Sequence, residues 1–147
     1  MKAIITLVFV LLTILSSYGQ DLKLSILKGT DKPNSEKEHL YLLGVTNTGN
    51  IKMSFSISAI NKQCVDEKSS QIDLSHQIMN KYKATQADQL NLKPGESIEV
   101  YVKISRPLNA KLNSWNCTEI KAISSNGNAV SNAIIIESLI PDPKDFN

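Results

Sequence analysis

The chain has 147 residues, of which 41% are hydrophobic and 20% are charged, and 16 lysines and arginines face 14 aspartates and glutamates. This length supports one compact domain and is too short for two ordinary ones. The near-balanced charge, with lysines scattered rather than clustered, gives no long-range attraction to nucleic acid or to an anionic membrane. We therefore expect no nucleic-acid partner.

The first nineteen residues have the composition of a secretory signal peptide. Lys2 supplies the positive start, residues 3–15 are almost entirely apolar, and small residues lead to Gly19. The apolar run is shorter than the roughly 20 residues that a membrane-spanning helix needs. We expect cleavage of residues 1–19 and export to the periplasm, the cell surface or the medium. No membrane span is expected in the remaining part.

Alternating apolar and polar residues predict β-strands through most of the exported part, because successive side chains on a strand point to opposite faces. The clearest segment is residues 51–59, in which every second residue from Ile51 to Ala59 is apolar. Between such segments lie clusters of glycine, proline, asparagine and aspartate, which favour turns. In chain order, strands are expected over residues 21–28, 39–47, 51–59, 72–78, 98–104, 117–124 and 129–140.

Two parts of the chain have a weaker pattern. Residues 66–90 hint at one short strand, and the stretch 79–89 suits either a helical turn or a loop. We expect a strand followed by a loop. After the last strand, Pro141 and Pro143 predict an extended tail over residues 141–147.

Seven short strands separated by turns, with few helical patterns, are typical of an immunoglobulin-like β-sandwich of antiparallel strands. Each strand has one apolar face, so two packed layers are needed to bury these faces. We therefore expect one all-β domain over residues 21–140. A small closed barrel would give the same periodicity and stays open as an alternative.

The exported part contains two cysteines, Cys64 and Cys117. An even pair in an oxidising compartment favours a disulfide, and the Cys-x-x-Cys spacing of a redox pair is absent. In the expected sandwich Cys64 follows the third strand and Cys117 opens the sixth. These strands are antiparallel neighbours, so the two sulfurs would meet at one rim. Such a bridge differs from the inter-sheet bridge of antibody domains.

Two short motifs resemble a bacterial group of immunoglobulin-like domains. Asn47 and Gly49 form an Asn-x-Gly turn after the second strand, and Pro94-Gly95 lies in the turn before the fifth. The group includes the cell-adhesion-related domain found in bacteria and the similar domain appended to some secreted glycosidases. The resemblance covers residues 38–137. It implies a non-catalytic module that works beside other surface proteins or enzymes.

The sequence contains no motif of a catalyst, a cofactor site or a metal centre. The nucleophile elbow, the Ser-x-x-Lys motif and the glycine-rich phosphate loop are absent. A blue-copper site needs a histidine shortly after its cysteine, and Cys117 is followed by none. His39 and His76 are isolated, and the acids form no calcium-loop pattern. We therefore expect no enzymatic activity, no cofactor and no metal.

Asn116-Cys117-Thr118 matches the N-glycosylation pattern. Because the predicted signal peptide looks like those of exported bacterial proteins, we interpret this as a chance match.

Two surfaces are candidates for binding. The run Ile134-Ile135-Ile136 breaks the alternation of the last strand and predicts an edge strand open to a protein partner, unless the tail or residues 79–89 cover it. Tyr101, on the polar face of its strand, and Trp115, beside Cys117, are candidates for a sugar platform. A cross-strand tyrosine pair and a ring that shields the disulfide are the plainer interpretations.

Three functions remain open. The first, which we expect, is a secreted adhesion, scaffold or interaction module with a protein partner of unknown identity. The second is a carbohydrate-binding accessory domain, which predicts Tyr101 and Trp115 exposed on one face. The third is a small secreted enzyme, which would require a cleft with convergent polar groups of shifted pKa.

Overall fold

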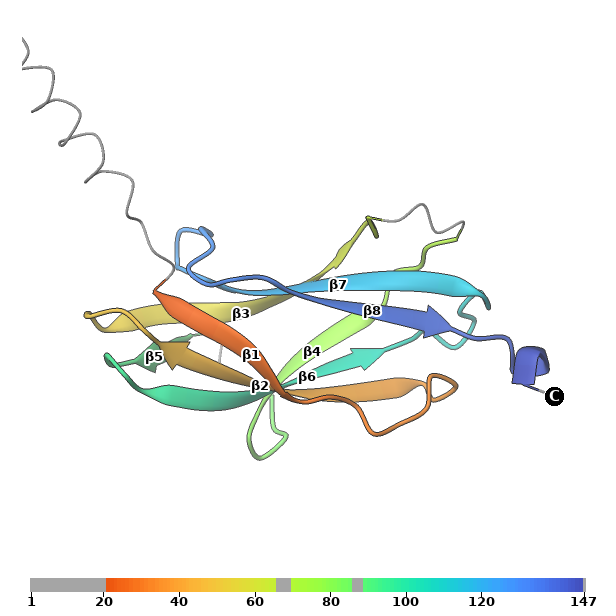
Figure 1. The fold of residues 1–147 in the computed structure, drawn as a ribbon, viewed down its shortest axis with the longest axis horizontal. Helices are drawn as coiled ribbons and strands as arrows, with labels where there is room; N and C mark the ends of the chain where they lie inside the picture. The colour runs from red at the N-terminus through yellow and green to blue at the C-terminus, as the bar shows by residue number, and fades with distance from the viewer. Residues whose placement is uncertain (1–20, 66–69, 86–88, 147) are drawn as a thin grey trace, which may run out of the picture.

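The computed structural model describes residues 21–65, 70–85 and 89–146 (Figure 1). The predicted signal peptide, residues 1–19, lies outside the described residues. In chain order the elements are β1 (Leu22–Lys28), β2 (Glu38–Asn47), β3 (Met53–Lys62), β4 (Ser75–Asn80), β5 (Leu90–Leu92), β6 (Ser97–Ser105), β7 (Ser114–Ile123), β8 (Ile134–Ile140) and the 3-10 helix η1 (Pro143–Phe146).

The strands form two antiparallel sheets of four strands each. Sheet 1 has the order β1-β2-β6-β4, and sheet 2 has the order β5-β3-β7-β8. In Figure 1 sheet 2 runs along the top of the molecule and sheet 1 along the bottom, with the strands of both sheets lying lengthwise. The prediction of an all-β, two-layer domain is confirmed for the described residues, with eight strands where seven were expected.

The additional strand is β5, which pairs with the start of β3. It has only three residues, too few for an alternating pattern to distinguish it from a loop. The strand expected over residues 51–59 begins two positions later, at Met53, and Ile51 stays exposed in the preceding turn. The strand expected over residues 72–78 is β4, which starts at Ser75 and is followed by a turn, in agreement with the expected order of strand and loop.

The tail differs from the extended segment expected over residues 141–147, because η1 forms there. The side chain of Asp142 accepts a hydrogen bond from the backbone N–H of Lys144 at 3.0 Å, which is the contact of a helix N-cap. Pro143 follows as the first helical residue, where its fixed φ and its missing N–H are tolerated. The same prolines that suggested an extended tail therefore suit the start of a helical turn.

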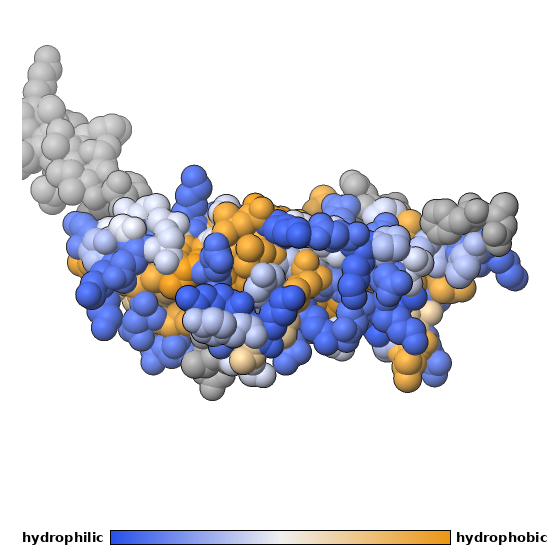
Figure 2. Space-filling model, turned by 90° about the horizontal axis from the view of Figure 1, so that it is seen from below, coloured by the Kyte–Doolittle hydropathy of each residue, from blue (hydrophilic) through white to orange (hydrophobic). Residues whose placement is uncertain are grey.

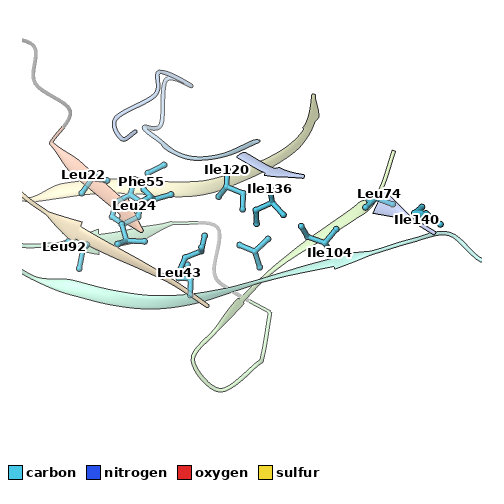
Figure 3. Packing of buried hydrophobic residues seen from close by; sticks show 14 residues of the cluster. Leu22, Leu24, Leu43, Phe55, Leu74, Leu92, Ile104, Ile120, Ile136 and Ile140 are labelled. Carbon is cyan, nitrogen blue, oxygen red and sulfur yellow. The ribbon is translucent and has the colours of Figure 1, made fainter. Parts of the chain in front are cut away.

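The core lies between the two sheets (Figure 3). Leu43 on β2 and Val100 on β6 are fully buried from the side of sheet 1, and Phe55 on β3 and Ile120 on β7 are buried from the side of sheet 2. Burying one such side chain contributes roughly 1.5–3 kcal/mol. The period-two pattern of the sequence therefore corresponds to burial between two layers.

Asn47 is a fully buried polar residue at the end of the molecule where β2 turns into β3. Its side-chain amide donates to the carbonyl oxygens of Ile51 at 2.8 Å and Leu92 at 3.0 Å. Its side-chain oxygen accepts from the N–H of Gly49 at 2.9 Å, which closes the Asn-x-Gly turn. One side chain thus pairs three backbone groups that would otherwise lack partners.

The backbone of Asn47 also holds the second turn motif. Its N–H donates to the carbonyl of Glu96, and its carbonyl accepts from the N–H of Gly95, both at 2.9 Å. Gly95 has a φ of 76°, which glycine adopts without the steric cost of a side chain. The two motifs that carry the resemblance therefore lie side by side and hold each other in place.

Two further asparagine side chains pair with backbone as a peptide group would. Asn61 bonds both the N–H and the carbonyl of Leu74 at 3.0 Å. Asn132 bonds the N–H of Leu24 at 2.8 Å and its carbonyl at 3.0 Å. A side-chain amide can do this because it carries one acceptor and two donors. Asn132 joins β1 of sheet 1 to the segment that leads into β8 of sheet 2.

Asn47→Ala should destabilise the domain by about 3 kcal/mol in urea unfolding, because it leaves buried carbonyls without donors. Asn47→Asp keeps the size and the acceptor but replaces the donor with an oxygen, and should be no more stable than the alanine variant. Asn34→Ala, at an exposed position, is the matched control and should stay within about 0.5 kcal/mol of the parent. A loss at Asn47 no larger than in this control would contradict the assignment.

Candidate functional site

The two cysteines form a disulfide at one rim of sheet 2. Cys64 lies two residues past the end of β3, and the last residue of that strand, Lys62, pairs in register with Cys117. The Cα atoms of the cysteines are 5.3 Å apart. The predicted bridge between the ends of neighbouring strands is thereby confirmed.

Trp115 lies on β7 two positions before Cys117, so the two share the outer face of sheet 2. Its backbone N–H donates to the carbonyl of Ser70 at 2.8 Å, and its carbonyl accepts from the N–H of Ile72 at 2.9 Å. Residues 70–72 therefore run beside β7 beyond the point where β3 ends. Trp115 is partly buried and belongs to this structured rim.

Tyr101 lies on β6 in sheet 1, and its side chain is partly buried on the outer face. Trp115 lies on the other sheet. The structure does not bring these two candidates for a sugar platform together. The positions of Tyr101 and Trp115 along the chain do not indicate which sheet each strand joins.

A network of hydrogen bonds between buried and partly buried side chains connects sheet 1 to sheet 2. His76 on β4 lies 2.9 Å from the hydroxyl of Thr118 on β7, and this hydroxyl donates to the side-chain oxygen of Asn116 at 2.8 Å. The amide of Asn116 donates to the side-chain oxygen of Asn61 at 2.7 Å and to the carbonyl of Ile72 at 2.8 Å. Asn116 is 2% exposed and uses both amide protons, so its nitrogen is not accessible for glycosylation.

This hydrogen-bond network determines which ring nitrogen of His76 carries a proton. The hydroxyl of Thr118 has one proton and gives it to Asn116, so it must accept from the Nε2–H of His76. Burial lowers the pKa of His76, and the nearby Asp73 opposes this only in part. Burial also lowers the pKa of His39, whose ring contacts Thr30 and the carbonyl of Glu36. Both histidines are held neutral in structural hydrogen bonds.

Glu119 is a nearly buried carboxylate on the outer face of sheet 2. Hydrogen bonds from Lys121 at 2.9 Å and Lys62 at 3.3 Å hold its pKa below the usual range. In register on either side lie Ile60 on β3 and Ile135 on β8, which are 47% and 49% exposed. The face thus carries an ion-paired centre between two exposed apolar side chains.

The predicted edge strand is β8, which ends the order of sheet 2. Of the isoleucine run, Ile136 enters the core, Ile134 is partly buried and Ile135 points outward. Glu137 is the charged residue of this strand, which contains neither lysine nor proline. The break in alternation therefore has a structural reason: one of three isoleucines stays half exposed beside the sheet edge.

The other three sheet edges are less open. β1 has a register irregularity near Leu27 and carries lysines, and β4 is paired at Met79 with Thr85 of its own following turn. β5 has three residues and covers only the start of β3, whose remaining part is paired on one side and ends in Lys62. Bulges, lysines and short strands are features by which proteins protect sheet edges from added strands. β8, with seven residues, has none of these features.

The outer face of sheet 1, together with Leu90 at the neighbouring end of β5, lines a hollow of about 640 Å³. In Figure 2 this face is seen from below, and hydrophobic residues lie among hydrophilic ones across its middle. Ser25, Gly44 and Glu99 form one row of the floor on three adjacent strands. Leu27 and Tyr82 line the hollow from β1 and from the turn after β4. Sequence reasoning missed this site because its residues come from separate strands.

No metal site is indicated in the described residues, since no group of three or more histidine, cysteine, aspartate or glutamate side chains could hold an ion there. Within the same residues no helix is long and apolar enough to cross a membrane.

No family model matches the chain, and no curated protein matches it significantly. Among solved structures it is similar to a FixG-related protein from Vibrio parahaemolyticus, with 17% identity, a TM-score of 0.52, and coverage of 84% of this chain and 99% of that one. At this identity the likeness shows the fold alone.

Two further solved structures have lower TM-scores. The apo PCuAC domain of PmoF2 has a TM-score of 0.42 and 12% identity over 84% of this chain and 91% of that chain. A family 123 glycoside hydrolase from Clostridium perfringens has a TM-score of 0.45 and 9% identity over 71% of this chain, which spans 21% of the hydrolase. These values are too low to support an argument about copper or glycan chemistry.

Replacing both cysteines with alanine should lower the free energy of unfolding by roughly 4 kcal/mol, because the disulfide closes a long loop in the unfolded chain. Denaturant unfolding of the oxidised parent, the double variant and the reduced parent measures this difference in the free energy of unfolding. The reduced parent should match the double variant. An oxidised parent no more stable than the double variant would contradict a bridge formed in the exported protein.

His76 should make stability depend on pH near neutrality. Its pKa is lowered in the folded state, so the unfolded chain binds more protons as pH falls below about 6.5. The contribution is complete above that pH and is lost as pH falls from there toward the lowered folded pKa. His76→Gln should reduce the pH dependence of the unfolding free energy between pH 7 and 5, and His39→Gln should remove a further part of this pH dependence. An unchanged profile in the double variant would refute this prediction.

Proposed function

We propose that the chain is an exported, non-catalytic immunoglobulin-like module that binds a protein partner along β8. The observation that carries this proposal is the unprotected state of the β8 edge. The partner would add an extended segment to sheet 2, with main-chain hydrogen bonds providing affinity and side chains providing selectivity.

The strand order supports the immunoglobulin-like assignment. Constant-type immunoglobulin domains have the first, second, fifth and fourth strands in one sheet and the third, sixth and seventh in the other. With β5 set aside as an addition at the edge, β1-β2-β6-β4 and β3-β7-β8 follow the same order. The Asn-x-Gly and Pro-Gly turns, bonded to each other through Asn47, are consistent with the resemblance to bacterial members of this class.

The chemistry of the outer face supports a peptide strand as the ligand of β8. Ile135 would lie next to the added strand and offers half of its side chain for contact. Glu137, two residues further on the same face, favours a partner with a basic residue opposite to it. The partner would therefore be an extended segment with alternating apolar and basic residues.

Export is supported by the disulfide together with the predicted signal peptide. Cysteines 64 and 117 are 5% and 3% exposed and form the bridge. Structural disulfides are rare in reducing compartments. The absence of catalytic motifs in the sequence agrees with a binding role, and the two histidines are engaged in structural hydrogen bonds.

Ile135→Lys should weaken binding of the partner at least tenfold, because a lysine at a sheet edge disfavours an added strand. Ile60→Lys is the matched comparison, since Ile60 has nearly the same exposure and lies on the same face, but on β3 at the opposite side of the sheet, beyond the residues that β5 covers. A photo-reactive residue placed at each position in the exported chain would record contacts in the producing cells, and light scattering would record self-association.

Adducts at position 135 that are absent at position 60 and lost on competition with the unlabelled parent support the proposal. If position 135 gives a second copy of the chain, the parent should also be larger than a monomer in light scattering. Equal labelling at both positions, or none at 135, would overturn binding along β8.

A further inference from the structure

We propose that the hollow on the outer face of sheet 1 binds a neutral saccharide. The hollow has a volume of about 640 Å³, which lies within the range of small-ligand sites. It lies on the sheet opposite to β8, so this inference concerns a second site and does not depend on the proposed protein partner.

The backbone of the floor is already engaged in the sheet. Ser25, Gly44 and Glu99 belong to adjacent strands that are paired with one another. An extended peptide gains affinity mainly from free backbone groups, which Gly44 does not offer because β2 is paired on both sides. In the hollow, β6 lacks a partner on one side only at Ser97–Glu99, since its pairing with β4 ends at Val100. Over most of the floor a ligand must therefore be recognised by side chains.

The polar side chains of the hollow suit hydroxyl groups. Thr46 and Ser97 hold their hydroxyls 2.8 Å apart, and Ser25 adds a third hydroxyl in the next row. Each hydroxyl can both donate and accept, as the hydroxyls of a sugar do. Glu99 contributes an acceptor and Lys81 a donor, so the lining has one charge of each sign. An anionic ligand would instead need an excess of cationic groups.

Two exposed apolar side chains, those of Tyr82 and Leu27, flank this polar floor. Tyr82 is 78% exposed, and Leu27 on β1 is 52% exposed. Sugar rings have C–H faces that pack on aromatic and aliphatic side chains while their hydroxyls form hydrogen bonds at the ring edge. A tyrosine has the same two-sided character, with an apolar ring and a polar end.

Gly44 allows the side chain of Leu27 to lie close to the floor of the hollow. It lies in the middle of the floor, and a Cβ atom there would come within 3.2 Å of the side chain of Leu27. A large residue at position 44 would displace Leu27, which lines the hollow, and would change the shape of the hollow.

The turn that carries Tyr82 is fixed before a ligand arrives. It follows β4 and protrudes from sheet 1 at the bottom of Figure 1. The side-chain oxygen of Asn80 accepts from the N–H groups of Tyr82 at 2.9 Å and Ala84 at 3.2 Å. Lys83 is held at a φ of 60°, a conformation that residues other than glycine adopt at a cost. A preformed platform reduces the entropy lost on binding.

The test is native electrophoresis of the exported chain in gels that contain one neutral polysaccharide each: xyloglucan, galactomannan, laminarin or hydroxyethylcellulose. Gels with polygalacturonate or heparin serve as anionic comparisons. We expect retardation in at least one neutral gel. Tyr82→Ala should weaken this binding about tenfold, which corresponds to the loss of one stacking contact, and Gly44→Leu should abolish it.

Leu108→Ala is the control, because Leu108 is 83% exposed and lies outside the hollow. This variant, and Ile135→Lys on the other sheet, should be retarded like the parent. If Gly44→Leu does not fold, Tyr82→Ala decides, since it removes an exposed side chain. No retardation in the four neutral gels, retardation by anionic polymers alone, or equal retardation of Tyr82→Ala and parent would overturn the proposal.

Discussion

The structure depends on how backbone groups are paired where the chain leaves one sheet and enters the other. Strand ladders satisfy these groups only along their length, and a buried N–H or carbonyl without a partner costs about 1–3 kcal/mol. Here asparagine side chains supply the missing partners: Asn47 at one end of the sandwich, Asn61 near the disulfide, and Asn132 between β1 and the segment before β8. An aliphatic residue at these positions would fill the space but leave the carbonyls unpaired.

These contacts also decide which surfaces stay open. Asn132 and the backbone bond from Leu22 to Val130 tie the start of β1 to the segment before β8, and β1 then continues along β2. β8 therefore begins where the contact with β1 ends, and its outer edge stays without a strand. In the same way Asn80 closes the turn after β4, which places Tyr82 beside the floor of the hollow.

Local patterns predicted the parts of the fold that depend on neighbours in sequence. The alternation in residues 98–104 gave β6 within one residue at each end, and the position of Cys64 and Cys117 relative to their strands gave the disulfide. β5 was missed because three residues carry no period, and η1 because proline starts a helical turn as readily as an extended tail. The hollow was missed because its floor is a row of residues from three strands. The register that aligns these residues cannot be predicted from the sequence of any single strand.

The two proposed sites differ in the groups they use, and this follows from their positions in the sheets. An edge strand offers backbone donors and acceptors, which any extended peptide can match, so selectivity at β8 must come from the few side chains beside it, chiefly Ile135 and Glu137. The outer face of a sheet offers mainly side chains, so the hollow can select by shape and by hydroxyl geometry. A module with both sites could hold a protein partner on one sheet while a saccharide occupies the other. Neither ligand would displace the other, because the buried core separates the two surfaces.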